Sequence, residues 1–222
     1  MEHHPNCFLC EHSLPEWKDA IRSHARIRSF KRGAAIFKEG DAFEGCYFIH
    51  NGKVKVHKQW GDEGKEMIMK FVAAGEVLGH RGMSSAAIYP VSATAVEEVT
   101  ACFISPEFFR TTLLVNHELA YKMVQLYADE LQKAEQHMRN IVHRNVKGRI
   151  ADSLLTLERL FGKDEKGCLL GNLSKQDIAS FACTTYETLF KVLNEWAEAG
   201  IVTTAGRQIY IPDSRQLLPF ID

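Results

Sequence analysis

The sequence predicts an α+β chain: an antiparallel β domain, then a long helix, then a C-terminal helix pair with a hairpin. Three observations predict this fold class. Short apolar runs broken by glycine extend to about residue 105, and one long apolar stripe at helical spacing follows Pro106. Two capped helical segments then lie between Leu173 and Leu193.

Composition restricts the class of protein further. The chain has 222 residues, 45% hydrophobic and 25% charged, which is typical of a soluble globular protein of one or two domains. No apolar run approaches the roughly 18 residues of a membrane span, and the N-terminus lacks the pattern of a secretory signal. We therefore expect a cytoplasmic protein whose six cysteines are reduced thiols or metal ligands.

The overall charge of the chain does not indicate a nucleic-acid partner. The net charge is −1, and residues 144–222 contain ten Lys and Arg against ten Asp and Glu. Any DNA-binding face must therefore arise from the local placement of a few cations.

The first 105 residues divide into an arm and a β domain. Residues 1–26 are a polar arm with Cys7 and Cys10, and Trp17–Ala25 predicts one short helix. Residues 27–105 predict a closed sandwich or barrel, because many strand-sized runs alternate with glycine-containing turns. These runs are Ala35–Phe37, Cys46–Ile49, Val54–Val56, Met67–Val72, Val91–Ala93 and Ala101–Ile104.

Residues 106–145 predict a dimerisation helix. Apolar residues recur there at alternate spacings of four and three, as in a coiled-coil seam of about three heptads. The seam residues are Ala120, Val124, Tyr127, Leu131, Ala134, Met138 and Ile141. A single helix packing this stripe on its own β domain is the alternative. A homodimer is favoured, because two-fold dimers read DNA half-sites about 34 Å apart and the seam is about as long.

Residues 146–222 predict a helix from Val146 to about Phe161, in which Gly148 is a candidate hinge, and then a helix-turn-helix. Ser174 caps its first helix with Asp177 three positions on, and Thr184 with Glu187 repeats this pattern after a break at Cys183-Thr184. Residues 201–211 form a hairpin in the position of a wing. A packed helical pair without a DNA role is the alternative.

Several segments in this order resemble the CRP/FNR family of bacterial transcription regulators across nearly the whole chain. They are Phe37–Asp41, Tyr47–Val56, Gly75–Gly79, Val146–Ala151 and Leu173–Ala179. The resemblance implies an N-terminal antiparallel β-roll of the double-stranded, cupin-like jelly-roll type, a long dimerisation helix and a C-terminal winged helix-turn-helix. It also implies double-stranded DNA, a second copy of the chain and RNA polymerase as partners.

The resemblance places an effector pocket after the Gly-Glu-x-x-Gly turn. Its residues are Gly75, Glu76, Gly79, His80, Arg81 and Tyr89. In the family a Glu accepts from the ribose of a cyclic nucleotide and an Arg-Ser pair holds its phosphate. Here the Glu position falls on His80 and the Arg-Ser position near Tyr89, while Arg81 is out of register. The chain therefore resembles the FNR-like branch, and cyclic-nucleotide binding is not expected.

That branch holds an iron–sulfur cluster with four cysteines. Cys7 and Cys10 match the first two positions and Cys102 the last, but the third falls on Glu16, for which His12 is a possible substitute. The cofactor stays open. An iron–sulfur cluster competes with other metal or thiol chemistry, with haem or another small effector, and with no ligand at all. Cys102 as a small buried hydrophobe is a further alternative.

The second helix of the pair carries the expected base-reading residues. The family reads bases with a Glu and, four residues later, an Arg; Glu187 matches the first and Lys191 stands at the second. Tyr186 and the bulky Phe190 depart from the usual residues and indicate a different site sequence. The residues expected at the DNA are Lys175, Thr185, Tyr186, Glu187, Phe190, Lys191 and Arg207.

The functional hypothesis is a homodimeric regulator that reads a palindromic site under control of a small-molecule or redox signal sensed by the β-roll. An enzyme is not expected, because the chain lacks a His-x-x-x-His pair, a phosphate-cradling glycine loop and a Gly-x-Ser-x-Gly elbow. The remaining rival is a β-roll ligand-binding or docking module without sequence-specific DNA binding.

Overall fold

The computed structural model describes residues 7–60, 65–171 and 173–221. The chain divides into two compact units, each described by itself below. The first comprises Met1–Lys58 and Phe71–Ala134, and the second Gln59–Lys70 and Glu135–Asp222.

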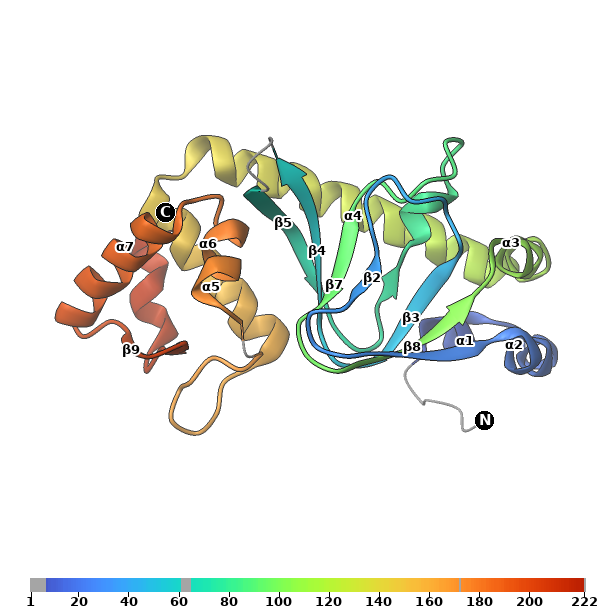
Figure 1. Ribbon diagram of the computed structural model, residues 1–222, viewed down its shortest axis with the longest axis horizontal. Helices are drawn as coiled ribbons and strands as arrows, with labels where there is room; N and C mark the ends of the chain where they lie inside the picture. Colours follow the sequence, from blue (N-terminus) through green and yellow to red (C-terminus); the bar gives the residue numbers. More distant parts are fainter. Residues whose placement is uncertain (1–6, 61–64, 172, 222) are drawn as a thin grey trace. The chain divides into compact units, whose positions relative to one another are not determined.

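Eight strands form the β-roll as two four-stranded sheets, ordered β1-β8-β3-β6 and β2-β7-β4-β5 (Figure 1). The strands are β1 Arg26–Phe30, β2 Ala35–Phe37, β3 Cys46–Asn51, β4 Val54–Trp60, β5 Lys65–Val72, β6 Val77–Leu78, β7 Ser92–Ala95 and β8 Val99–Ile104. The pairs β1/β8, β3/β8, β3/β6, β2/β7 and β4/β7 run antiparallel. This confirms the predicted antiparallel fold. Sequence reasoning missed β1, whose side chains are mostly exposed, and the two-residue β6.

Strand β3 separates two buried clusters, because successive side chains of a strand point to opposite faces. Tyr47 and Ile49 lie in the cluster between the two sheets, with Tyr89 stacked on Phe37 at a centroid distance of 4.0 Å. Phe48 lies in the other cluster, beneath the helices. Aromatic rings and aliphatic side chains together thus fill the interior of the roll.

Helices cover the outer face of one sheet. The first three are α1 Phe8–His12, η1 Pro15–Trp17 and α2 Lys18–His24. The helix predicted over Trp17–Ala25 corresponds to α2. Helix α3, Pro106–Val115, begins at the N-cap Ser105, whose side chain accepts from the Phe108 N–H at 3.4 Å. Helix α4, His117–His143, follows directly after Asn116.

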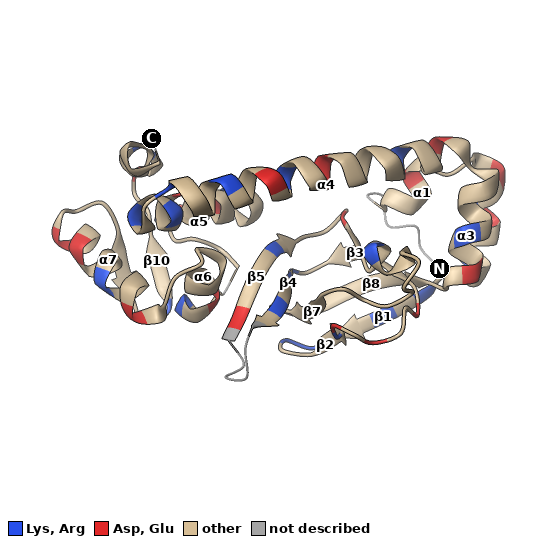
Figure 2. Ribbon diagram, turned by 90° about the horizontal axis from the view of Figure 1, so that it is seen from above, with Lys and Arg blue, Asp and Glu red and all other residues tan. Residues whose placement is uncertain are grey.

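Helix α4 presents two apolar faces. Leu119 and Met123 are 0% and 3% exposed and pack in the cluster beneath the helices. A second stripe, Val124, Leu131 and Met138, is more than 60% exposed. These are three of the seven residues of the predicted seam; another, Tyr127, is less exposed, at 38%. Charged residues of both signs are spaced along the same helix (Figure 2).

The second unit contains helix α5, Val146–Phe161, then α6, Lys175–Phe181, and α7, Tyr186–Glu198 (Figure 1). The hairpin β9, Thr203–Ala205, and β10, Gln208–Tyr210, is antiparallel, and η3, Ser214–Phe220, completes the unit. The predicted helix-turn-helix and hairpin are confirmed.

Gly148, the candidate hinge, makes a close backbone contact. It is buried inside α5, where a Cβ atom would lie 2.5 Å from the backbone oxygen of Phe220. The glycine therefore lets the C-terminal turn approach α5 closely.

Throughout the part of the chain that the structure describes, every helix is too short or too polar to traverse a bilayer.

Candidate nucleic-acid interface and sensor sites

Helix α6 begins with the capping box that the sequence predicts. Ser174 Oγ accepts from the Asp177 N–H at 3.0 Å, and Asp177 Oδ2 accepts from the Ser174 N–H at 3.1 Å. Two otherwise unsatisfied N–H groups are thereby bonded, which fixes where the helix starts.

The turn between α6 and α7 differs from the prediction by one residue. Cys183 adopts a left-handed conformation (φ +49°), so the chain turns later and Thr185, not Thr184, caps α7 by accepting from the Thr188 N–H at 3.2 Å. Arg149 stabilises this turn by donating to the Cys183 oxygen at 3.2 Å. Sequence reasoning missed this role of Arg149, because its partners lie more than 30 residues away in the chain.

Helix α7 has one buried and one exposed face. Leu189, Val192, Leu193 and Trp196 are buried, as the predicted stripe requires. The opposite face is exposed and carries four of the residues expected at the DNA. They are Tyr186, Glu187, Phe190 and Lys191, with Asn194 one turn further on.

The remaining residues expected at the DNA, and the charge state of Glu187, complete the description of this unit. Lys175 Nζ, at the start of α6, lies 5.7 Å from the Phe190 ring centroid. The pKa of the Glu187 carboxyl lies below its ordinary value, because its own backbone N–H and the Thr185 side chain donate to it. Arg207 lies exposed in the turn between β9 and β10.

The predicted effector region begins at a sharp turn. Gly79 has φ +80°, and a Cβ atom there would lie 2.7 Å from the Gly45 oxygen. His80 follows, 2% exposed, with Nε2 at 3.0 Å from Glu130 Oε2 on α4. Tyr127, also on α4, donates its hydroxyl to the His80 oxygen at 2.7 Å, and burial raises the pKa of Tyr127 to about 12. The β-roll is therefore bonded to the long helix at His80.

The other predicted pocket residues do not converge. Tyr89 is buried beside Gly79, and its hydroxyl donates to the Gly45 oxygen at 2.8 Å. Glu76 is exposed, and its carboxylate accepts from the Ala73 N–H at 2.7 Å, which closes the turn that contains Gly75. Arg81 is exposed.

The three candidate ligand cysteines lie in or against the buried cluster beneath the helices. Cys7 and Cys102 are 2% and 4% exposed, and the half-buried Cys10 packs against the same cluster. A hydrogen bond from the Cys10 side chain, and a second from His50, lower the pKa of Cys7 to about 4, while burial raises that of Cys102 to about 12. His50 was not foreseen, because β3 brings it to the arm only in the folded chain.

The candidate metal ligands also include His12. The ring of His12 packs edge-on against Phe8 at 4.7 Å. Among residues 7–60, 65–171 and 173–221, no three His, Cys, Asp or Glu side chains are arranged to hold a metal ion. The described part of the chain therefore gives no geometric support to a cluster or zinc site at these thiols.

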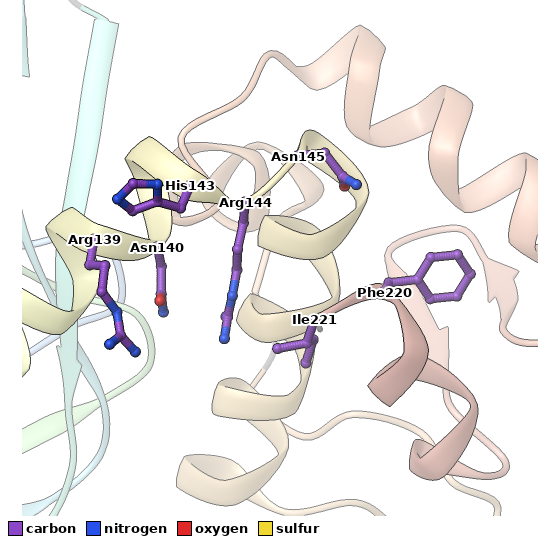
Figure 3. Close-up of a pocket in the computed structure, with 7 residues that line it drawn as sticks. All are labelled: Arg139, Asn140, His143, Arg144, Asn145, Phe220 and Ile221. Carbon is purple, nitrogen blue, oxygen red and sulfur yellow. The ribbon is translucent and has the colours of Figure 1, made fainter.

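A cavity of about 420 Å³ lies where α4 ends and α5 begins (Figure 3). Figure 3 shows Arg139, Asn140 and Arg144 pointing toward it beside Ile221. Asp152 neutralises part of this charge, because its carboxylate lies 2.9 Å from Arg144 Nη1 and accepts from Asn140 at 3.1 Å. The lining is completed by His143, Asn145 and Phe220.

Comparison with known proteins agrees with this geometry. Residues 27–116 match the family model of the cyclic nucleotide-binding domain, and residues 148–220 match that of the Crp-like helix-turn-helix domain. A CRP-like cAMP-activated global transcriptional regulator of Mycobacterium tuberculosis is 27% identical over 200 residues, covering 89% of each chain. The transcriptional activator protein Anr of Pseudomonas protegens is 27% identical over 224 residues, covering 97% of this chain and 91% of its own.

Solved structures agree on the fold. FixK2 from Bradyrhizobium japonicum superposes with a TM-score of 0.78 at 24% identity, covering 89% of this chain and 98% of its own.

A β-roll, a long helix and a helix-turn-helix in one chain define the class of DNA-binding transcription regulators, which are not enzymes. The chain belongs to the CRP/FNR family. Its relatives include both cAMP-activated regulators and Anr-type activators.

Proposed function

We propose that the protein is a cytoplasmic homodimer that reads a palindromic DNA site and contacts RNA polymerase, as regulators of its family do. The exposed stripe of α4 supports the dimer. Val124, Leu131 and Met138 are each more than 60% exposed, and Val142 extends the stripe with 71%. A coiled-coil seam with a second copy would remove these side chains from water.

Residues of the exposed α7 face read the bases in this proposal. Glu187 accepts from a cytosine amino group and Lys191 donates to a guanine. Thr185, Lys175 and Arg207 contact phosphates, which position the protein without reading sequence. The observation that carries the proposal is that α7 buries one complete apolar stripe while its polar face stays free for the major groove.

The sensor belongs, in our proposal, to the branch that does not use cyclic nucleotides. His80 stands where the ribose-binding Glu is expected and is already engaged by Glu130. Tyr89 stands near the expected phosphate site, where its buried ring stacks on Phe37. Both positions are occupied by the chain's own side chains.

A redox signal at Cys7 and Cys10 fits the arm better than a cluster. Two neighbouring thiols, one buried and one half-exposed, pack with Leu119 and Met123 at the start of α4. A change in these thiols therefore alters the packing of the dimerisation helix, and the bond between His80 and Glu130 offers a second route to it. Such coupling shifts the population of two dimer arrangements.

The test is selection of binding sequences from random duplex DNA under reducing and oxidising conditions, followed by titration of the selected duplex. Glu187→Ala and Lys191→Ala are expected to lose sequence preference with unchanged thermal unfolding. Glu165→Ala and Lys166→Ala, in the exposed loop before α6, are matched controls that should bind normally. Absence of any selected sequence in every redox state would refute the regulator and favour the docking module.

A further inference from the structure

We propose that Tyr186 and Phe190 form an apolar reader on α7 that recognises the C5-methyl groups of thymines in the operator. This inference rests on the proposed DNA-binding function and names how part of the sequence is read.

The two aromatic rings form one continuous surface. They are 40% and 45% exposed, their centroids lie 6.2 Å apart, and their planes differ by 15°. Residues four apart on a helix lie on the same side, so both rings are presented together. Lys175 Nζ lies 5.7 Å from the Phe190 centroid, which places a cation beside the apolar surface.

The core does not need these rings. Leu189, Val192, Leu193 and Trp196 already bury the apolar side of α7 at 5% exposure or less. Two large rings left in water are unfavourable, and an exposed apolar pair on an otherwise polar face indicates a contact surface.

The neighbouring charges indicate DNA as the occupant. Glu187 and Lys191 follow Tyr186 and Phe190 directly, so the row of rings lies beside a row of groups suited to cytosine and guanine edges. The edges of base pairs in the major groove are polar except for the thymine methyl. The apolar surface of the two rings therefore matches the thymine methyl. Recognition of the operator would then combine this apolar contact with hydrogen bonds to base edges.

The size of the effect follows from one methyl group. Removing it from an apolar contact weakens binding about fourfold, and about fifteenfold when both half-sites of a dimer lose it. Deoxyuridine differs from thymidine by this methyl alone and keeps every hydrogen bond of the base pair.

The experiment uses the full-length protein and the duplex that it selects from random DNA. Thymines of the half-sites are replaced by deoxyuridine one position at a time, symmetrically in both half-sites, and binding is measured by fluorescence anisotropy. We expect about fifteenfold weaker binding at one or more positions and no change for replacements in the flanks. The Phe190→Ala or Tyr186→Ala protein should bind the thymine duplex and its deoxyuridine counterpart equally. The Phe190→Leu protein keeps an apolar contact and should still bind the deoxyuridine duplex more weakly.

Two results would overturn the inference: equal binding of wild type to every thymine and deoxyuridine duplex, or an unchanged ratio in both alanine variants. The first would leave the rings to a protein partner. These failures differ from failure of the regulator itself, in which no sequence is selected and Glu187→Ala changes nothing.

Discussion

Truncating one residue of the exposed α4 stripe should dissociate the dimer without unfolding the chain. Leu131 is 61% exposed, so the β-roll contributes little to its burial. Leucine-to-alanine truncation removes three carbons, each worth about 0.8 kcal/mol when fully buried. Scaled by the fraction that only a partner can cover, the loss is about 1.5 kcal/mol per copy and about 3 kcal/mol per dimer. The dimer Kd should rise about 150-fold.

Sedimentation equilibrium of wild type and Leu131→Ala over a range of concentrations measures this change. Leu114→Ala is a matched control, because Leu114 on α3 is also 61% exposed but lies outside the stripe. Its dimer Kd should stay within about twofold of wild type, since surface substitutions away from contacts have small effects.

Two results would refute the reasoning. One is a Leu131→Ala protein that dimerises as tightly as wild type, which would assign the stripe to another partner. The other is an equal loss in Leu114→Ala, which would indicate a general effect of exposed leucines.

Three further predictions concern the free energy of unfolding, which urea denaturation measures in each case. Gly79→Ala should lower the free energy of unfolding more than Gly33→Ala does. Both glycines have φ near +80°, so an alanine at either position carries about 1–2 kcal/mol of backbone strain. Only the alanine at position 79 would also meet a backbone oxygen, and equal losses would argue against that close approach. Ser174→Ala should cost about 1 kcal/mol through its lost cap, whereas the exposed Ser84→Ala should cost almost nothing. Burial lowers the pKa of His137 below its ordinary 6.5, so the unfolded chain binds its proton more readily and stability should fall as pH drops below about 6.5; His137→Gln should weaken this dependence, and His143→Gln, at an exposed site, should not.

Much of the DNA-binding unit was predictable because its signals are local. The Ser174–Asp177 box, the stripe from Leu189 to Trp196 and the hairpin around Gly206 each depend on residues within a few positions of one another. The cap of α7 was misplaced by one residue, because Cys183 adopts a left-handed conformation that neighbouring residues do not require.

The sensor was less predictable because its contacts join distant segments. The family resemblance implied Cys7, Cys10 and Cys102 as candidate ligands, but only the folded chain reveals that His50, on β3, lies beside Cys7. Likewise His80 was assigned to an effector pocket, and its partner Glu130 lies 50 residues away on α4.

Local sequence signals thus predicted the order of the main elements, the two apolar periodicities and the cap of α6, since propensity, capping and amphipathicity act over one or two turns. The tertiary structure alone decided which face of α4 is buried, that Tyr89 fills the roll and that Tyr186 and Phe190 remain exposed. The physical reason is that burial depends on which surfaces meet after folding. The chain has more apolar side chains than its core can hold, and local sequence does not specify which of them remain exposed.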